Sequence, residues 1–208
     1  MYKINDSLVE QKIKKVASEG RSLLILLVVA ILFFCISILN AFVFFKVQVS
    51  GKSMEDTLNN GDVLVVNKRL LANRGDIVII SGENNTELIV KRVIAMGGDT
   101  IKIVDGYVYL KKAGEQNFKF LDEEYLLKRG RTFWTVPYNA MEESIKKNQQ
   151  LVVPDGCVFY LGDNRENSKD SRSEYGCCYQ NQILGVVENW ALSIRGIAGF
   201  FNRIFNFV

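Results

Sequence analysis

An uninterrupted apolar run is the feature that most constrains the fold. Residues 23–45 read LLILLVVAILFFCISILNAFVFF and contain no charged side chain. At about 1.5 Å per residue, a helix of this length exceeds the roughly 30 Å hydrocarbon core of a bilayer. A cleavable signal peptide is the alternative, but its apolar core spans only about 7–15 residues and ends in a small-residue site. This run is longer and ends in Val-Phe-Phe-Lys, so we predict an uncleaved transmembrane helix over 23–45.

The basic residues on either side of the run predict its orientation. Five basic side chains lie in residues 1–22, and two lie in residues 46–65. Because cytoplasmic flanks carry the excess of Lys and Arg, we predict a single-pass protein of the cytoplasmic membrane with a cytoplasmic N-terminus. The expected organisation is a cytoplasmic segment (1–22), the span (23–45), an extracytoplasmic domain (46–189) and a tail (190–208). The domain is long enough to enclose one hydrophobic core.

Short apolar runs separated by turn dipeptides predict a mostly β domain. The runs DVLVVNK, DIVII, ELIVKRVIA, TIKIV and YVYLKK are rich in Val, Ile and Tyr, and Asn84-Asn85 and Asp105-Gly106 lie between two pairs of them. QQLVVPDG, CVFYLGDN and ILGVVENWALSI follow later. No helical periodicity separates these runs, so we predict an antiparallel β-barrel or sandwich-like fold. The more polar stretch 112–149 is expected to be an insertion that covers the core.

The C-terminal tail has a different pattern. Apolar residues recur at helical spacing from Trp190 to Val208, which predicts an amphipathic helix. Arg195 and Arg203 disfavour a second span, because each costs about 2.5–3.5 kcal/mol near the middle of a bilayer. Two placements remain open: the helix lies in the membrane interface, or it packs on the domain.

The chain contains no histidine, which excludes Ser-His-Asp triads and His-ligated zinc. The chain has four cysteines, and none of them forms a CxxC pair that would predict a metal site: Cys35, Cys157, Cys177 and Cys178. We expect these cysteines to be free thiols packed in the interior, although a disulfide from Cys157 to Cys177 or Cys178 stays open. A net charge of +3 gives no indication of nucleic-acid binding. Catalysis would therefore depend on Ser, Lys, Asp, Glu, Tyr or Cys.

A serine nucleophile without imidazole needs another base, and a lysine that is held neutral can act as one. Burial lowers the pKa of a lysine from its usual value of about 10.4, and Lys91 lies in the apolar run LIVKRVI. Ser53 follows Gly51 in a turn after the first predicted strand, where its hydroxyl and backbone N–H could both face a carbonyl. Taken singly, each residue has an ordinary interpretation: a strand lysine whose end reaches solvent, and a turn serine.

Four segments together resemble those of bacterial type I signal peptidases. They are GKSMEDTL (51–58), RGDIV (74–78), KRVIAMGGD (91–99) and GDNRENSKDSR (162–172), and they follow one N-terminal span in the order of that family. The resemblance extends from the predicted span to about Gly185. The last segment is the most specific, because eleven residues of that mixture seldom recur by chance.

The resemblance implies a role for each matching residue. Ser53 matches the nucleophile, whose backbone N–H contributes to the oxyanion hole, Lys91 matches the general base, and Ser168 matches a serine that orients the lysine. The charged residues that would brace the site are Arg92, Asp163, Asp170 and Arg172. Ordinary surface ion pairs, worth about 0–1 kcal/mol each, are the alternative for these four. The implied substrate-binding residues are Val47, Val49, Gly51, Met54, Leu58, Leu88, Ile89 and Val90. Core packing is the alternative for the apolar ones, and for Leu58 the two are equally favoured.

The sequence also departs from the family pattern. Asp56 and Gly97 stand where the family usually has proline, and we expect these looser residues to soften the site. The stretch from Arg172 to Gly176 is one residue longer than usual. Some relatives place a second serine hydroxyl in the oxyanion hole; the matching position here is Gly51, and Ser50 is one residue away, so that role is not assigned.

The resemblance implies a membrane-bound serine endopeptidase that removes N-terminal signal peptides from exported preproteins through an acyl-enzyme. It implies small residues at the first and third positions before the cut, and no metal or cofactor. The expected partners are signal peptides and the lipid bilayer, with the secretion machinery as a further candidate and no nucleic acid. Family members that use histidine in place of the lysine are excluded, because this chain has none.

Two other functions compete with this one. The first is a non-catalytic, signal-peptidase-like assembly factor or chaperone, which Asp56 and Gly97 favour. The presence of Ser53, Lys91 and Ser168 argues against it, since a binding module has no need of a neutral buried lysine. The second is a soluble self-cleaving repressor that also uses Ser-Lys chemistry, and the predicted span disfavours it.

Overall fold

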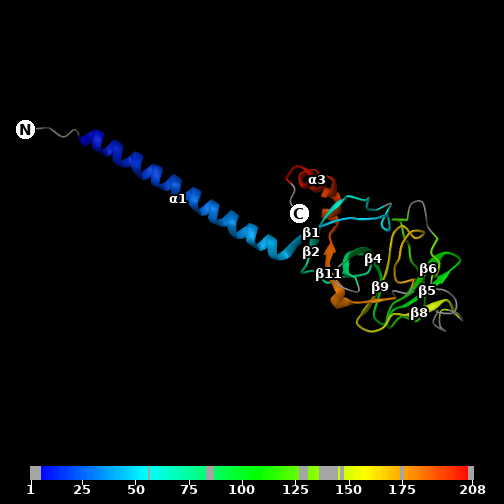
Figure 1. Cartoon of the computed structure of the whole chain (residues 1–208). Coiled ribbons are helices and arrows are strands. Elements are labelled where there is room, and N and C mark those ends of the chain that lie inside the picture. Colours follow the sequence, from blue (N-terminus) through cyan, green and yellow to red (C-terminus); the bar gives the residue numbers. More distant parts are fainter. Residues whose placement is uncertain are drawn as a thin grey trace, which may run out of the picture. The chain divides into compact units, whose positions relative to one another are not determined.

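The computed structural model describes residues 6–55, 57–82, 87–126, 131–135, 145, 148–173 and 176–205. Asp56 and the Asn84-Asn85 turn, both singled out in the sequence, lie outside these residues. The chain divides into two compact units, Met1–Val43 and Phe44–Val208. Figure 1 labels most of the helices and strands.

The first unit contains helix α1 (Asp6–Val43). Its part Glu19–Val43 is long and apolar enough to cross a membrane by length and composition. The helix ends two residues before the predicted span does, because Phe44 and Phe45 begin strand β1 (Phe44–Gln48) and pair with Asn67 and Val66. The predicted boundary at residue 45 is corrected to Val43: the backbone groups of Phe44 and Phe45 bond across a sheet rather than along a helix.

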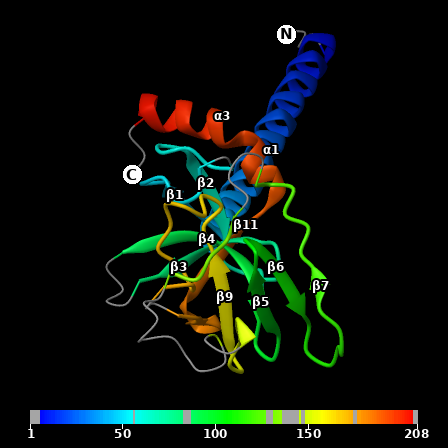
Figure 2. The same ribbon diagram turned by 90° about the vertical axis from the view of Figure 1, so that its right-hand side faces the viewer.

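The second unit is built from two antiparallel sheets (Figure 2). The larger sheet has the order β1, β2 (Val63–Asn67), β11 (Ile183–Val187), β3 (Ile77–Ser81), β4 (Leu88–Met96), β9 (Cys157–Leu161) and β10 (Cys178–Tyr179). The smaller sheet has the order β7 (Lys119–Phe120), β6 (Tyr107–Lys111), β5 (Thr100–Val104) and β8 (Gln150–Val152). A short 3₁₀ helix, η2 (Gln180–Gln182), precedes β11. Every strand pairing in the described residues is antiparallel, which confirms the predicted mostly β fold.

The hairpin between β5 and β6 turns at the dipeptide that predicted it. Asp105 and Gly106 both have positive φ, at 52° and 86°. A two-residue hairpin loop of this kind needs positive φ at both central positions, because only then does its twist match that of the strands. Val104 and Tyr107 consequently face each other as the last pair of the ladder.

The predicted insertion contributes to the core of the second unit. Ile145 is buried in a cluster with Ile101, Ile103 and Phe159, and Leu121 and Trp134 pack against the same cluster. The rings of Trp134 and Phe159 meet edge to face, with centroids 6.0 Å apart. Segments from both ends of the stretch 112–149 thus cover the apolar side chains of β5 and β9.

Helix α3 (Asn189–Phe205) begins one residue before the amphipathic tail that was expected over 190–208. The run ILGVVENWALSI divides at this point, so that its first half forms β11 and its second half forms the start of α3. Ala191 is fully buried, the ring of Trp190 meets that of Phe44 edge to face, and Arg195 lies 3.2 Å from Asp62. The start of the helix therefore packs on the domain. Side chains from residue 198 onward lie outside the description, and their placement in a membrane interface stays a prediction.

Candidate active site

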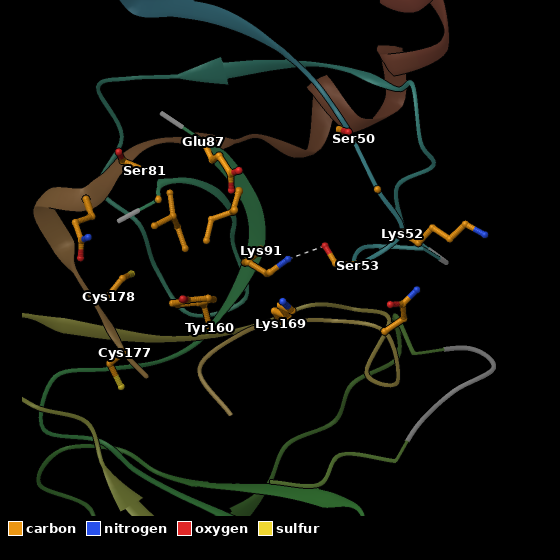
Figure 3. A pocket seen from close by; sticks show the side chains of 16 residues that line it. Ser50, Lys52, Ser53, Ser81, Glu87, Lys91, Tyr160, Lys169, Cys177 and Cys178 are labelled. Atoms are coloured by element: carbon orange, nitrogen blue, oxygen red, sulfur yellow. Dashed lines mark hydrogen bonds between the residues drawn. The ribbon is translucent and has the colours of Figure 1, made fainter. Parts of the chain in front are cut away.

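A hydrogen bond joins Lys91 and Ser53, which are 38 residues apart in the chain. The Nζ atom of Lys91 lies 2.6 Å from the Oγ atom of Ser53 (Figure 3). Lys91 lies in the middle of β4, whereas Ser53 lies in the turn that follows β1. The structure thus brings together the two residues that the sequence singled out for nucleophilic chemistry.

The turn that carries Ser53 depends on a glycine. Gly51 has a φ of 95°, a conformation that residues with a β carbon rarely adopt. The Gly51 amide donates to Oδ1 of Asn60 at 2.9 Å, and the Leu58 amide donates to the Met54 carbonyl at 2.8 Å. These bonds close the turn on both sides of Ser53.

Burial determines the protonation of Lys91. The side chain is only 5% exposed, and this burial lowers its pKa from an ordinary 10.5 to about 8. Nearby Asp170 and Asp163 act in the opposite direction and raise the pKa, while Arg172 lowers it. The dominant cause is the cost of removing an ammonium group from water. Near neutral pH a usable fraction of Lys91 is therefore neutral and can accept a proton.

Two buried ion pairs stabilise the loop 162–172. Arg92 contacts both carboxylate oxygens of Asp163 at 2.9 and 2.7 Å, and Arg172 contacts both oxygens of Asp170 at 2.8 Å. Both carboxylates are fully buried, so these are not the surface pairs that the sequence left as an alternative. Removing one member of such a pair leaves an uncompensated buried charge, which typically costs about 3–5 kcal/mol.

The loop also holds the backbone of the nucleophile. The Asn164 amide donates to the carbonyl oxygen of Ser53 at 3.0 Å, and the Asn164 side chain donates to the Lys52 carbonyl at 3.0 Å. Asp170 is tied to the same segment, since it accepts a hydrogen bond from the Gly162 amide at 3.0 Å. The position of Ser53 therefore depends on this loop as well as on its own turn.

Ser168 belongs to the same loop, and its hydroxyl is buried. Its Oγ atom has no hydrogen-bond partner among the residues that the structure describes. The structure thus records no bond from Ser168 to Lys91, and the orienting role of Ser168 stays a prediction.

A cleft of about 650 Å³ extends from the Ser53–Lys91 pair (Figure 3). Gly51 and Ile89 line it, together with Tyr160, Cys177 and Cys178, which the sequence did not single out for the site. Leu88, by contrast, is 48% exposed and does not line the cleft. The remaining predicted substrate-binding residues are buried in the core: Val47, Val49, Met54, Leu58 and Val90. These five residues pack in the core, and their part in substrate binding stays a prediction.

Three residues that contact the site lie inside the quoted motifs but were not singled out. Thr57 donates to Asp163 at 2.6 Å, the Asn164 amide donates to the Ser53 carbonyl, and Arg165 is a buried residue of the loop 162–172. Their position within GKSMEDTL and GDNRENSKDSR was the signal that could have identified them. Tyr160 lies two residues before the segment GDNRENSKDSR, and no sequence pattern indicates that it lines the cleft.

Gly97 has a packing reason that the sequence did not reveal. A β carbon at this position would lie 3.0 Å from both the Pro154 carbonyl oxygen and the Gly156 amide nitrogen. Gly97 does not line the cleft. The absence of a side chain at position 97 therefore lets the segment 154–156 approach the end of β4, and the expected softening of the site stays a prediction.

Comparisons with known proteins identify the family of the chain. Residues 21–191 match the family model described as signal peptidase, peptidase S26. A signal peptidase I of Bacillus caldolyticus is 39% identical over 74% of this chain and 82% of its own length. Signal peptidase I T of Bacillus subtilis strain 168 is 33% identical over 80% of both chains. A crystal structure of a signal peptidase I from Enterococcus faecalis V583 is 28% identical, covers 56% of this chain and 97% of its own, and has a TM-score of 0.43. The chain belongs to the signal peptidase family, peptidase S26.

Proposed function

We propose that this protein removes N-terminal signal peptides from exported preproteins, with Ser53 as nucleophile and Lys91 as general base. The observation that carries the proposal is the 2.6 Å contact between Ser53 Oγ and the Nζ atom of a buried lysine whose pKa is about 8. A serine hydroxyl is a weak nucleophile until a base beside it can accept its proton.

The reaction proceeds in two stages. Ser53 Oγ attacks the scissile carbonyl while Lys91 accepts the hydroxyl proton, and the backbone N–H of Ser53 stabilises the oxyanion that forms. Lys91 then gives this proton to the leaving amine, which departs as the mature protein and leaves the signal peptide esterified to Ser53. Lys91 next takes a proton from water, the hydroxide attacks the ester, and Ser53 recovers its proton as the signal peptide leaves.

The cleft supports a preference for small side chains before the cut. Ile89 of β4 lines it with a branched side chain, and Gly51 lines it without one. An extended signal-peptide segment would add as a strand beside the start of β4, so that backbone hydrogen bonds supply affinity and the cleft supplies selectivity. The expected substrate has an Ala-X-Ala-like sequence before the scissile bond.

The apolar part of α1 supports a membrane anchor. With five basic residues before the run and two after it, the N-terminus would be cytoplasmic and the second unit extracytoplasmic. The bilayer and signal peptides are then the partners, and the secretion machinery that delivers preproteins is a further one.

The test is cleavage of preproteins by the full chain in detergent. Ser53→Ala and Lys91→Ala should each lower kcat/KM by about a thousandfold or more, because the nucleophile and its base act as one unit. Ser50→Ala and Lys52→Ala are matched controls, since both residues line the cleft without joining the Ser53–Lys91 hydrogen bond. Normal cleavage by Ser53→Ala would refute the mechanism. A wild type that binds several preproteins but cleaves none would instead identify a non-catalytic assembly factor.

A further inference from the structure

Arg165 joins the loop 162–172 to the insertion. Its guanidinium contacts both carboxylate oxygens of Glu123, at 2.5 and 3.0 Å, and it donates to the hydroxyl of Thr132. The Arg165 Nε atom donates to the Gly162 carbonyl at 3.1 Å. The Arg165 side chain is fully buried and that of Glu123 is 8% exposed, so water screens this pair little.

Tyr125 provides a second connection from the same insertion. The guanidinium of Arg92 lies over the Tyr125 ring at 3.9 Å from the centroid, and the Tyr125 hydroxyl donates to Glu123 at 2.7 Å. A guanidinium stacked on an aromatic ring is held in one plane, which favours the two-point contact of Arg92 with Asp163.

Both connections lead to the nucleophile. Asp163 accepts a hydrogen bond from Thr57, which lies in the turn that carries Ser53. Through Gly162, Arg165 holds the start of the segment in which the Asn164 amide binds the Ser53 carbonyl. Glu123 thus acts on the loop 162–172 through Arg165, and Tyr125 acts on the same loop through Arg92.

We propose that Glu123 and Tyr125 form a clamp that positions Ser53 for attack. This inference rests on the proposed peptidase function. Neither residue lines the cleft, so both are positioning residues that act through Arg165 and Arg92. Their expected effect is on turnover: a small displacement of the nucleophile lowers the rate of the chemical step and leaves substrate binding almost unchanged.

The experiment compares Glu123→Gln, Tyr125→Phe and Tyr125→Leu with the wild type in detergent, using a preprotein substrate. Tyr125→Leu removes the stacking surface under Arg92 and should lower kcat about tenfold to a hundredfold, with KM changed less than about twofold. Tyr125→Phe keeps the ring and should recover most of that loss. Glu123→Gln should lower kcat about tenfold. Glu124→Gln is the matched control, because Glu124 is the exposed neighbour of the clamp, and it should match the wild type.

A second readout separates positioning from general damage. The pH profile of kcat/KM should keep its midpoint in all clamp variants while its plateau falls, because the charges that shift the pKa of Lys91 are those of Asp170, Asp163 and Arg172, and none of these is substituted. A loss of activity explained wholly by a shifted midpoint would overturn the inference.

The remaining outcomes are equally decisive. If Tyr125→Leu fails to fold, Glu123→Gln decides the matter: a kcat about tenfold below that of the wild type supports the clamp, and a wild-type kcat refutes it. If the wild type cleaves the preprotein and all the clamp variants have the wild-type kcat, the clamp is refuted and the proposed function stands. An inert wild type refutes the proposed function itself.

Discussion

Gly162 and Ser168 approach so closely that a β carbon at position 162 would lie 2.2 Å from the Ser168 hydroxyl oxygen. The same β carbon would lie 2.5 Å from the carbonyl oxygen of Ser53. Real β carbons do not come this close to other heavy atoms, so Ser168 and the Ser53 backbone fit around position 162 only when it has no side chain.

Gly162→Ala should therefore displace Ser53 or Ser168. We expect kcat/KM to fall about a hundredfold and the free energy of unfolding to fall by about 1–3 kcal/mol, as for other overpacked sites. Preprotein cleavage and thermal unfolding measure the two effects. Gly196→Ala is the control: a β carbon there meets open space within α3, and alanine should slightly stabilise the helix. Full activity in Gly162→Ala would contradict the packing described here.

The activity should follow the deprotonation of Lys91. With a pKa of about 8, roughly a tenth of Lys91 is neutral at pH 7 and roughly nine-tenths at pH 9. The value of kcat/KM should consequently rise about tenfold between pH 7 and pH 9, with a midpoint near pH 8. A midpoint above pH 10, typical of an exposed lysine, would rule out the buried base.

The burial of Lys91 should also lower the free energy of unfolding of the protein. Its pKa is about 8 in the folded chain and about 10.5 when exposed, so between these values the unfolded chain binds more protons and stability rises with pH. Lys91→Met, which cannot titrate, should therefore be more stable than the wild type by up to about 3 kcal/mol at pH 7. This difference should shrink as the pH rises from 8 to 10.5, which denaturant titrations at several pH values can follow. A difference that stays constant with pH would have to come from packing instead.

Asp170 should set the midpoint of the pH profile. Its carboxylate raises the pKa of Lys91, so Asp170→Asn should move the midpoint below the wild-type value near pH 8. The substitution also leaves Arg172 buried without its partner, and a loss of about 3–5 kcal/mol of stability is expected. Kinetics are measured at a temperature where thermal unfolding shows the variant to be folded. An upward shift of the midpoint would contradict the charge assignment.

Gly97→Ala should separate packing from catalysis. The new β carbon would press on the backbone at Pro154 and Gly156, which predicts a loss of about 1–3 kcal/mol in stability. Because Gly97 lies outside the cleft, kcat and KM of the folded variant should match the wild type. A kcat that falls more than about threefold would show that this departure from the family pattern affects the site after all.

Features that depend on near neighbours in the chain were predictable from the sequence. The Asp105–Gly106 hairpin needs only two residues that tolerate positive φ, and the helix at the C-terminus follows from a repeating apolar spacing. The proximity of Ser53 and Lys91 spans 38 residues, and it was predictable through the family resemblance alone.

Features that depend on distant partners were not predictable. Phe44 and Phe45 suit a membrane helix and a strand equally well, and their pairing with β2 decides between the two. The contact of Glu123 with Arg165 joins residues 42 apart, and neither the composition nor the periodicity of the insertion indicates it. The sequence shows only that Gly97 stands where the family usually has proline, whereas its contact with the segment 154–156 appears only in the folded chain.

The direct passage from α1 to β1 fixes where this chain can be shortened. Val43 is the last helical residue and Phe44 is the first residue of an edge strand, so no spacer separates the apolar helix from the sheet. A fragment that begins at Phe44 keeps every partner of β2, whereas one that begins a few residues later exposes the backbone edge of β2 to other chains. For crystallisation or inhibitor screening, truncation at the peptide bond between Val43 and Phe44 consequently removes the helix and leaves the sheet whole.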